Sequence, residues 1–331
     1  MLRSPAILRF FWKTDVTICI PAYQAAGFID RTLRCAQGQT YRRLRILVTV
    51  DRSTDRTAHI CRQFRKDDPR IEVVEHEERL GWCGNVNSLL ERAETPFFFL
   101  YFHDDLILPQ YCEQLREALL RFPEAASAHC DLLDFGKSDV FRPGRTYDGS
   151  IAQRLLTLLV NKHRWPPLRG MVRRERIGPD CRLPDEGLDG FSPGTILLMR
   201  LLAAGPAMRV PQTLYLHWIR EAGLTDAWGF LPYETILRGR QVDLAQTFSL
   251  VDEKVSAKDD RRALKFAMTL YTFRKLAARC RAEGRPSPHM ANLHPEACLE
   301  LPTDVERFGP EIADWLRKEA AKAARQRKRL A

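Results

Sequence analysis

The sequence predicts a layered α/β domain with a mostly parallel central sheet, followed by a helical C-terminal region. Short apolar runs rich in β-branched residues alternate with segments of helical spacing through the first 130 residues. These runs show no polar alternation, which is typical of strands buried on both faces of a parallel sheet. From about residue 230 onward the spacing is mainly helical. We therefore expect an α/β domain over residues 1–225 and a helical region with a basic tail over residues 226–331.

The alternation places the individual elements in chain order. Strands are expected at residues 16–20, 45–50, 71–74 and 97–102, and helices at 28–37, 57–64, 84–93 and 109–122. The middle of the chain, residues 136–195, is rich in glycine, proline and charged residues, and we expect loops around a single helix at 151–161. Further helices are expected at 196–204, 261–281 and 311–329, with a proline-rich linker at 284–302.

The composition is that of a globular protein, because 45% of the 331 residues are hydrophobic and 28% are charged. These values exclude a mainly disordered chain. The formal net charge of +10 favours contact with polyanions such as nucleic acid, anionic lipid or phosphorylated substrates. Residues 317–329 hold seven basic residues and one acid. This tail is interpreted either as an anchor to an anionic membrane surface or as the solvated end of a helix.

The cysteine content and the length of the apolar runs favour a cytoplasmic protein. Nine cysteines are present, an odd number, and no two of them form a C-x-x-C pair. Free thiols in a reducing compartment are the simplest interpretation, and no zinc-type spacing is present. No apolar stretch reaches the 18 residues that a membrane span needs. We expect a soluble or peripheral protein of the cytoplasm, held if at all at the inner face of the membrane.

Residues that could bind a ligand follow three of the predicted strands. Asp51 ends the second strand, Asp104 and Asp105 follow the fourth, and residues 21–23 follow the first. Because the carboxyl ends of parallel strands meet at one edge of a sheet, these residues should lie together. Carboxylates are the ligands that Mg²⁺ and Mn²⁺ prefer beside substrate phosphates, so the acidic pair predicts a metal–diphosphate clamp. The alternative is that these acids only cap helices.

The glycine pattern excludes two nucleotide-binding classes. Gly81 and Gly84 bracket an aromatic residue before a predicted helix, where a backbone could approach an anion. Neither G-x-G-x-x-G nor G-x-x-x-x-G-K-[ST] is present, so a dinucleotide-binding domain and a P-loop NTPase lack their markers.

Five segments together resemble one known family, the inverting family-two glycosyltransferases of the GT-A fold. Their order and spacing are similar over residues 15–125, and the segments lie at residues 16–23, 33–41, 50–57, 84–87 and 102–105. The resemblance implies a GT-A-like fold, a nucleotide-sugar donor that is often UDP-linked, and Mn²⁺ or Mg²⁺ as cofactor. Two positions depart from the family pattern: Arg52 stands where a second acid is common, and His103 replaces the first acid of the metal-binding motif.

The resemblance also implies roles for individual residues. Asp51 would recognise the base, Asp104 would approach the ribose or the metal, and Asp105 would bind the metal. In a later segment that resembles the closing strand of the family, His217 and Arg220 could contact phosphate, although a packed histidine is an equal alternative. The rest of the nucleotide-sugar pocket would be formed by Pro21, Ala22, Tyr23, Ser53 and Asn85.

The catalytic base is the part of the pattern that this sequence departs from most. Inversion needs a carboxylate that takes the proton of the acceptor hydroxyl. In the family this acid often precedes a helix like that at residues 196–204, but here the expected position holds Pro193 or Gly194. The nearest acids give Asp189 as the first candidate and Glu186 as the second, and both could instead be solvated loop acids.

The sequence thus predicts a metal-dependent, inverting glycosyltransferase that acts on a glycan, lipid-linked or other acceptor in cell-surface polysaccharide biosynthesis. The departure at residue 194 keeps open a catalytically impaired nucleotide-sugar-binding protein of the same fold. A third hypothesis is a basic protein that binds nucleic acid. The sequence lacks ribonucleoprotein, zinc-binding and helix-turn-helix patterns, so no nucleic-acid partner is expected. A sugar-nucleotide pyrophosphorylase would need an N-terminal glycine-rich loop, which this chain lacks.

Overall fold

The computed structural model describes residues 14–137, 139–161, 165–178, 182–183, 193–220, 230–286, 293–294 and 304–330. The chain divides into two compact units. The first comprises Met1–Thr146, Trp165–Asp185 and Ala207–Gly223, and it contains the sheet. The second comprises Tyr147–Arg164, Glu186–Pro206 and Leu224–Ala331, and its described elements are helical.

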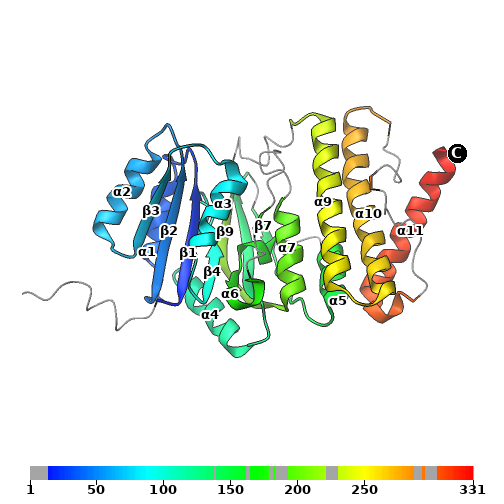
Figure 1. The fold of residues 1–331 in the computed structure, drawn as a ribbon, viewed down its shortest axis with the longest axis horizontal. Helices are drawn as coiled ribbons and strands as arrows, with labels where there is room; N and C mark the ends of the chain where they lie inside the picture. Colours follow the sequence, from blue (N-terminus) through cyan, green and yellow to red (C-terminus); the bar gives the residue numbers. More distant parts are fainter. Residues whose placement is uncertain are drawn as a thin grey trace, which may run out of the picture. The chain divides into compact units, whose positions relative to one another are not determined.

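The four predicted strands form one side of the sheet in the first unit (Figure 1). They are β1 (Val16–Ala22), β2 (Leu44–Asp51), β3 (Ile71–His76) and β4 (Phe97–Leu100). They pair in parallel in the order β3-β2-β1-β4. All residues of β1 and β4 are buried, which explains why the sequence shows runs of apolar residues without alternation.

The remaining strands make the sheet a mixed one. They are β5 (Leu106–Ile107), β6 (Ser127–Gly136), β7 (Val140–Arg142), β8 (Met171–Arg173) and β9 (Ala207–Ile219). The order continues β4-β8-β6-β9-β5, with β7 at the side of β6. β8 is antiparallel to β4 and β6, whereas β6 and β9 are parallel. The expectation of loops around a single helix at residues 136–195 is therefore wrong, because β7, β8 and two short helices form there. β8 has only three residues, too few for any periodicity, and pairing with distant strands defines it.

Helices cover both faces of the parallel strands. α1 (Ile29–Gln37), α2 (Thr57–Asp67) and α4 (Tyr111–Arg121) share one apolar core with alternate strand residues such as Ile18, Ile46 and Phe99. α3 (Gly81–Arg92) packs on β1 and β2, and the carbonyl of its Asn85 accepts a hydrogen bond from Thr49, one position out of phase with Val48 of that core. Successive strand residues point to opposite faces, so α3 covers the other face. Two short elements, η2 (Pro166–Arg169) and α6 (Arg174–Ile177), flank β8.

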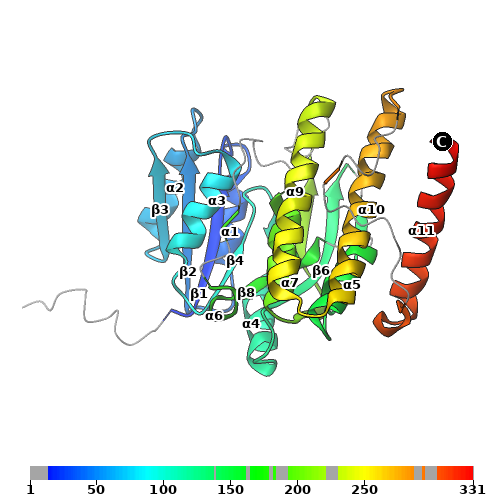
Figure 2. The same ribbon diagram turned by 45° about the vertical axis from the view of Figure 1, so that its right-hand side comes forward.

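The described elements of the second unit are helices packed on an apolar core (Figures 1 and 2). α9 (Tyr233–Lys254) and α10 (Lys258–Ala282) lie side by side, and α5 (Ile151–Val160) packs against α7 (Pro193–Ala204) and α10. The turn η5 (Glu306–Phe308) precedes α11 (Pro310–Leu330), whose Leu316 is fully buried. Buried Glu319 of α11 pairs with Arg274 at 3.1 Å, so this part of the helix is docked rather than frayed. Within the described residues, no helix combines the length and apolar character needed to cross a bilayer.

His129 gives the first unit a predicted sensitivity to acid. Its side chain is fully buried on β6, and burial lowers the pKa of the imidazole to about 4. An unfolded histidine titrates near 6.5, so the unfolded chain binds the proton more readily. Stability is therefore complete above about pH 6.5 and falls as the pH falls towards 4, by roughly 3 kcal/mol for this group. We expect His129→Gln to flatten urea-unfolding stability against pH in this window. Parallel curves for the variant and the original chain would contradict the assignment.

Candidate functional site

The ends of the parallel strands meet at one edge of the sheet, as the sequence predicts. The backbone N–H of Tyr101, just after β4, donates to the carbonyl of Cys19 on β1 at 2.8 Å. His103 Nδ1 lies 2.8 Å from the carbonyl oxygen of Pro21. Asn85 of α3 donates its Nδ2 to the Ala22 carbonyl at 3.4 Å. The segments after β1, β2 and β4 therefore form one continuous polar rim.

Asp51 holds the segment before α3 in place. The carboxyl is only 2% exposed, and its Oδ1 accepts a hydrogen bond from the Leu80 N–H at 2.6 Å. In the described part of the chain no donor is bonded to its second oxygen. Gly81 follows with a φ of 71°, a left-handed value that glycine adopts without strain. The guanidinium of Arg79 lies 4.4 Å from the ring centre of Tyr23, so the two side chains stack beside this acid.

The loops that follow β1 and β2 are tied to each other. Gln24 and Arg52 both have a positive φ, of 47° and 28°, which costs non-glycine residues on the order of 1 kcal/mol. Hydrogen bonds offset this cost: Gln24 N donates to Ser53 Oγ at 3.1 Å, and Gln24 Nε2 donates to Thr54 Oγ1 at 2.8 Å. Of the pocket residues implied by the resemblance, Tyr23 and Ser53 have exposed surface, whereas Pro21, Ala22 and Asn85 are buried. The exposed pair can meet a ligand directly, and the buried three shape the rim.

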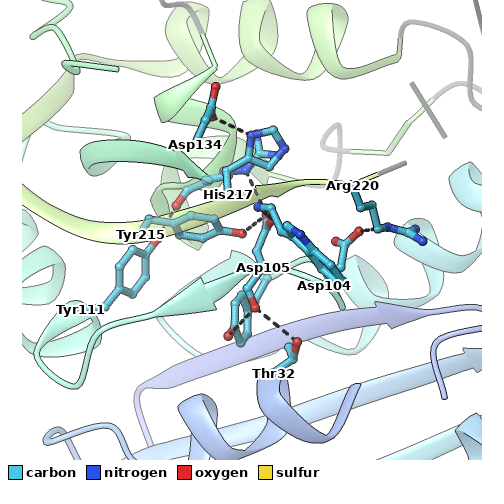
Figure 3. A network of polar contacts seen from close by, with 11 residues as sticks. Thr32, Asp104, Asp105, Tyr111, Asp134, Tyr215, His217 and Arg220 are labelled. Atoms are coloured by element: carbon cyan, nitrogen blue, oxygen red, sulfur yellow. Dashed lines mark hydrogen bonds and ion pairs between the residues drawn. The ribbon is translucent and has the colours of Figure 1, made fainter. Parts of the chain in front are cut away.

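Asp105 is a buried centre of hydrogen bonds (Figure 3). Its side chain is 1% exposed. Oδ2 accepts from the hydroxyl of Tyr215 at 2.7 Å and from Nε of Arg169 at 3.2 Å, and Oδ1 accepts from the Trp218 N–H at 3.0 Å. Burial, together with the charge of Asp105, raises the pKa of Tyr215 well above its usual value, so the phenol remains a donor. Both oxygens of Asp105 are thus engaged by the protein.

Arg169 supplies the charge that balances Asp105. It ends η2, its side chain is 11% exposed, and its guanidinium lies 5.0 Å from the ring centre of Phe102 and 5.7 Å from that of Tyr215. An ion pair this enclosed needs good geometry and further hydrogen bonds to offset the desolvation of both charges. Tyr215 and the Trp218 N–H provide those bonds, so Asp105 and Arg169 act as one structural unit.

Asp104 faces the other way and is more accessible. Its side chain is 19% exposed, and Oδ2 accepts from Nε of Arg220 at 2.7 Å. Figure 3 shows the Asp104–Arg220 pair directed away from the Tyr215 cluster that holds Asp105. The Arg220 guanidinium lies 4.6 Å from the ring centre of Phe28, the residue before α1. The two adjacent carboxylates therefore have different partners and do not share one site.

This donor arrangement does not fit a divalent cation. Mg²⁺ and Mn²⁺ need free carboxylate oxygens in an open octahedral setting. Asp105 offers none, and Oδ2 of Asp104 already has a cationic partner, so the described residues leave only Oδ1 of Asp104 without a protein partner. Over the described ranges no three histidine, cysteine or acidic residues converge on a point where a metal could sit. The metal-binding roles of Asp104 and Asp105 remain predictions from the resemblance.

Another buried acid, Asp134, lies on β6 opposite His217 in the strand register. Asp134 is fully buried and accepts from Nδ1 of His217 at 2.9 Å and from Nε of Arg142. Burial, followed by the charge of Arg169, lowers the pKa of His217, so the imidazole is neutral at neutral pH. Sequence reasoning did not single out Asp134, because its only signal is an acid inside a mainly apolar run. The predicted bases Asp189 and Glu186 lie outside the described residues.

Comparison with known proteins identifies the class of this domain. The family model of glycosyl transferase family 2 matches residues 17–175 of this chain. Over 94 residues the chain is 34% identical to the Bacillus subtilis protein TuaG, named as a teichuronic acid biosynthesis glycosyltransferase. That match covers 28% of this chain and 37% of TuaG. A Campylobacter jejuni GalNAc(5)-diNAcBac-PP-undecaprenol beta-1,3-glucosyltransferase is 27% identical over 94 residues, covering 28% of this chain and 30% of that protein.

Solved structures extend the likeness beyond the sequence match. S. aureus TarS 1–349 in complex with UDP-GlcNAc has a TM-score of 0.55 at 15% identity, covering 94% of this chain and 92% of that one. The mannosyltransferase PcManGT from Pyrobaculum calidifontis, in complex with GDP-Man and Mn²⁺, has a TM-score of 0.52 at 17% identity, covering 95% and 88%. The predicted GT-A-like fold is confirmed. The chain spans less than half the length of the first curated relatives it matches.

The different surroundings of the two acids predict different effects on stability. Asp105→Asn leaves Arg169 buried without a balancing charge, and we expect the free energy of unfolding to fall by about 3–5 kcal/mol. Asp104→Asn breaks a partly exposed pair and should cost roughly 1 kcal/mol or less. Urea unfolding followed by circular dichroism measures both changes. Equal losses for the two variants would contradict the buried role of Asp105.

Proposed function

We propose that this protein is a glycosyltransferase that moves a sugar from a nucleotide-diphospho-sugar, UDP-linked in the first instance, to a hydroxyl acceptor with inversion. The observation that carries the proposal is the continuous polar rim at the ends of β1, β2 and β4, where one oxygen of Asp51 has no donor among the described residues and Tyr23 stacks with Arg79. The family of residues 17–175 supports it, as do related folds solved with UDP-GlcNAc and GDP-Man.

Each part of the rim has a role in this proposal. Asp51 accepts a hydrogen bond from the base, and the ring of Tyr23 and the hydroxyl of Ser53 line the same pocket. Pro21, Ala22 and Asn85 hold the rim from beneath. The phosphates lie towards Asp104 and Arg220, which form the accessible charged pair of the site.

The reaction is a single displacement at the anomeric carbon of the donor. The oxygen of the acceptor hydroxyl forms a bond to this carbon while the bond to the β-phosphate oxygen breaks. The hydroxyl proton passes to a carboxylate, for which Asp189 is the first candidate and Glu186 the second. Attack from the face opposite the leaving diphosphate gives inversion. The nucleoside diphosphate leaves with the electron pair of the broken bond.

Mn²⁺ or Mg²⁺ was predicted as cofactor, with Asp104 and Asp105 as its ligands. Support for a metal comes from the Mn²⁺ complex of the related PcManGT fold. In this chain Asp105 is buried with Arg169, and Asp104 is paired with Arg220. The proposed reaction therefore contains no step that depends on a metal.

The acceptor belongs to the cell-surface glycans or their lipid-linked precursors. The names of TuaG and of the Campylobacter jejuni transferase, which mention teichuronic acid and undecaprenol, support this class. The basic end of α11 would hold the enzyme at the anionic inner face of the membrane. The alternative is a nucleotide-sugar-binding protein without transfer activity, and the observation that favours it is Pro193 and Gly194 at the expected position of the base.

A panel of donors tests the proposed function directly. We expect UDP-GlcNAc, GDP-Man or another nucleotide-diphospho-sugar to raise the melting temperature by a few degrees, because a ligand that binds only the folded state stabilises it. Release of the nucleoside diphosphate, followed by a coupled assay, should accompany binding, and the product linkage by NMR should show inversion. Binding without turnover over a broad acceptor panel would favour the impaired protein. If no donor shifts the melting temperature, the proposal is wrong.

Asp51 provides a test at the base end of the rim. Asp51→Asn keeps an oxygen for the Leu80 N–H but removes the charge offered to the base, so we expect nucleotide affinity to fall roughly 10- to 100-fold. Titration calorimetry with UDP measures the change. Asp67→Asn makes the same chemical change on the exposed end of α2 and should leave affinity as it was. Equal affinities for the Asp51 and Asp67 variants would remove Asp51 from the pocket.

A further inference from the structure

The accessible acid of the rim already holds a positive charge in a fixed position. Arg220 is fastened at two points, by its Nε on Asp104 at 2.7 Å and by the face of Phe28 at 4.6 Å from the ring centre. Its side chain is 26% exposed. Among the described residues, neither terminal nitrogen of the guanidinium has a hydrogen-bond partner. The planar end of this arginine is therefore oriented, charged and open to a ligand.

The surrounding charges also favour an anion at this place. Trp218 lies against Phe28, with ring centres 6.0 Å apart, and carries the guanidinium of Arg31 at 4.5 Å. Arg31 is exposed. Two arginines thus rest on the aromatic pair Phe28–Trp218, and a third, Arg169, is paired with Asp105. The arginines here therefore outnumber the two carboxylates of the motif, Asp104 and Asp105.

From this geometry we infer that Arg220, oriented by Asp104, takes the place of a divalent cation and binds the diphosphate of the donor through its terminal nitrogens. The inference rests on the proposed function, since it names the group that holds the donor. It assigns Asp104 a positioning role rather than a metal-ligand role. Nucleotide binding by this chain should then be independent of divalent metal.

The chemistry of a guanidinium suits this task. Its planar fork offers two parallel N–H groups that match two phosphate oxygens, and it keeps its charge at any working pH. When the bond between the sugar and the β-phosphate breaks, negative charge grows on the departing diphosphate. A fixed cation placed there stabilises that charge without rearranging at the moment of reaction. Lysine at the same position would supply a point charge without the fork.

The main competing explanation is that the Asp104–Arg220 ion pair forms only in the resting enzyme. In that case a metal displaces Arg220 from the carboxylate before the donor binds. The two explanations differ in what removing Arg220 does. If Arg220 is the cation, its loss weakens binding and frees Asp104 for a metal. If it is only a resting partner, its loss helps the metal and leaves metal-free binding as weak as before.

Titration calorimetry on the full chain with UDP and with GDP, each in EDTA and in excess MnCl₂, separates these explanations. Whichever of UDP and GDP binds the original chain more tightly should do so with affinities in EDTA and in MnCl₂ that differ by no more than about threefold. Arg220→Ala should lose roughly 10- to 100-fold in EDTA and recover part of this with Mn²⁺. The nucleotide affinity of Arg220→Lys in EDTA should lie between those of the original chain and of Arg220→Ala. Arg62→Ala is the matched control, because it removes an exposed arginine of α2 that pairs with Glu75 of β3. Its nucleotide affinity should equal that of the original chain.

The outcomes also separate this inference from the proposed function. Binding of the original chain only when Mn²⁺ is present would overturn the inference and leave the glycosyltransferase standing. Unchanged affinity of Arg220→Ala in EDTA would overturn it as well. No binding of either nucleotide in either condition would overturn both. Asp104→Asn gives a second check: a modest loss that is the same in EDTA and MnCl₂ supports positioning, whereas a loss confined to MnCl₂ shows a metal ligand.

Discussion

The buried pair of Asp105 and Arg169 is the contact on which the rim depends. It joins the segment after β4 to η2, and its two further donors, Tyr215 and the Trp218 N–H, bring in β9. These elements are 64 to 113 residues apart from Asp105 along the chain. An isolated carboxylate could not remain ionised in such a place, so the position of each partner is fixed by the need to balance one charge.

Neighbouring acids in one motif therefore have opposite tasks. Asp105 points inward and holds the sheet edge together, which leaves Asp104 to face the ligand side. The division occurs in the turn between β4 and β5, where the Asp105 N–H donates to the Phe102 carbonyl at 3.1 Å. Function in this chain then depends on what approaches Asp104. Here that group is Arg220, whose guanidinium lies over the ring of Phe28, and this aromatic surface limits the positions that the guanidinium can take.

The sequence predicted the parts of the molecule that depend on local pattern. The strands that became β1 to β4 and the helices from α1 to α4 were visible as apolar runs and helical spacing, because each buries its own residues continuously. β8 was not visible, since three residues carry no period and only β4 and β6 define it. In the site, Asp51, Asp104 and Asp105 could be named from their places at strand ends. Arg169 and Asp134 could not, because their partners lie far away in sequence.

The pairing of β6 with β9 has a consequence for how this family domain can vary in length. Between Cys130 and Leu132 the register is irregular: Cys130 faces Val210, whereas Leu132 faces Tyr215, so β9 carries three residues more than β6 over this stretch. Pro211 lies there, where its missing N–H costs no ladder bond. These extra residues determine which face of the sheet each later side chain of β9 points to. Loss of one residue would turn Tyr215 and His217 to the opposite face of the sheet. Evolution can therefore change the chemistry of the rim residue by residue, but an insertion or deletion in this short stretch would dismantle the rim at once.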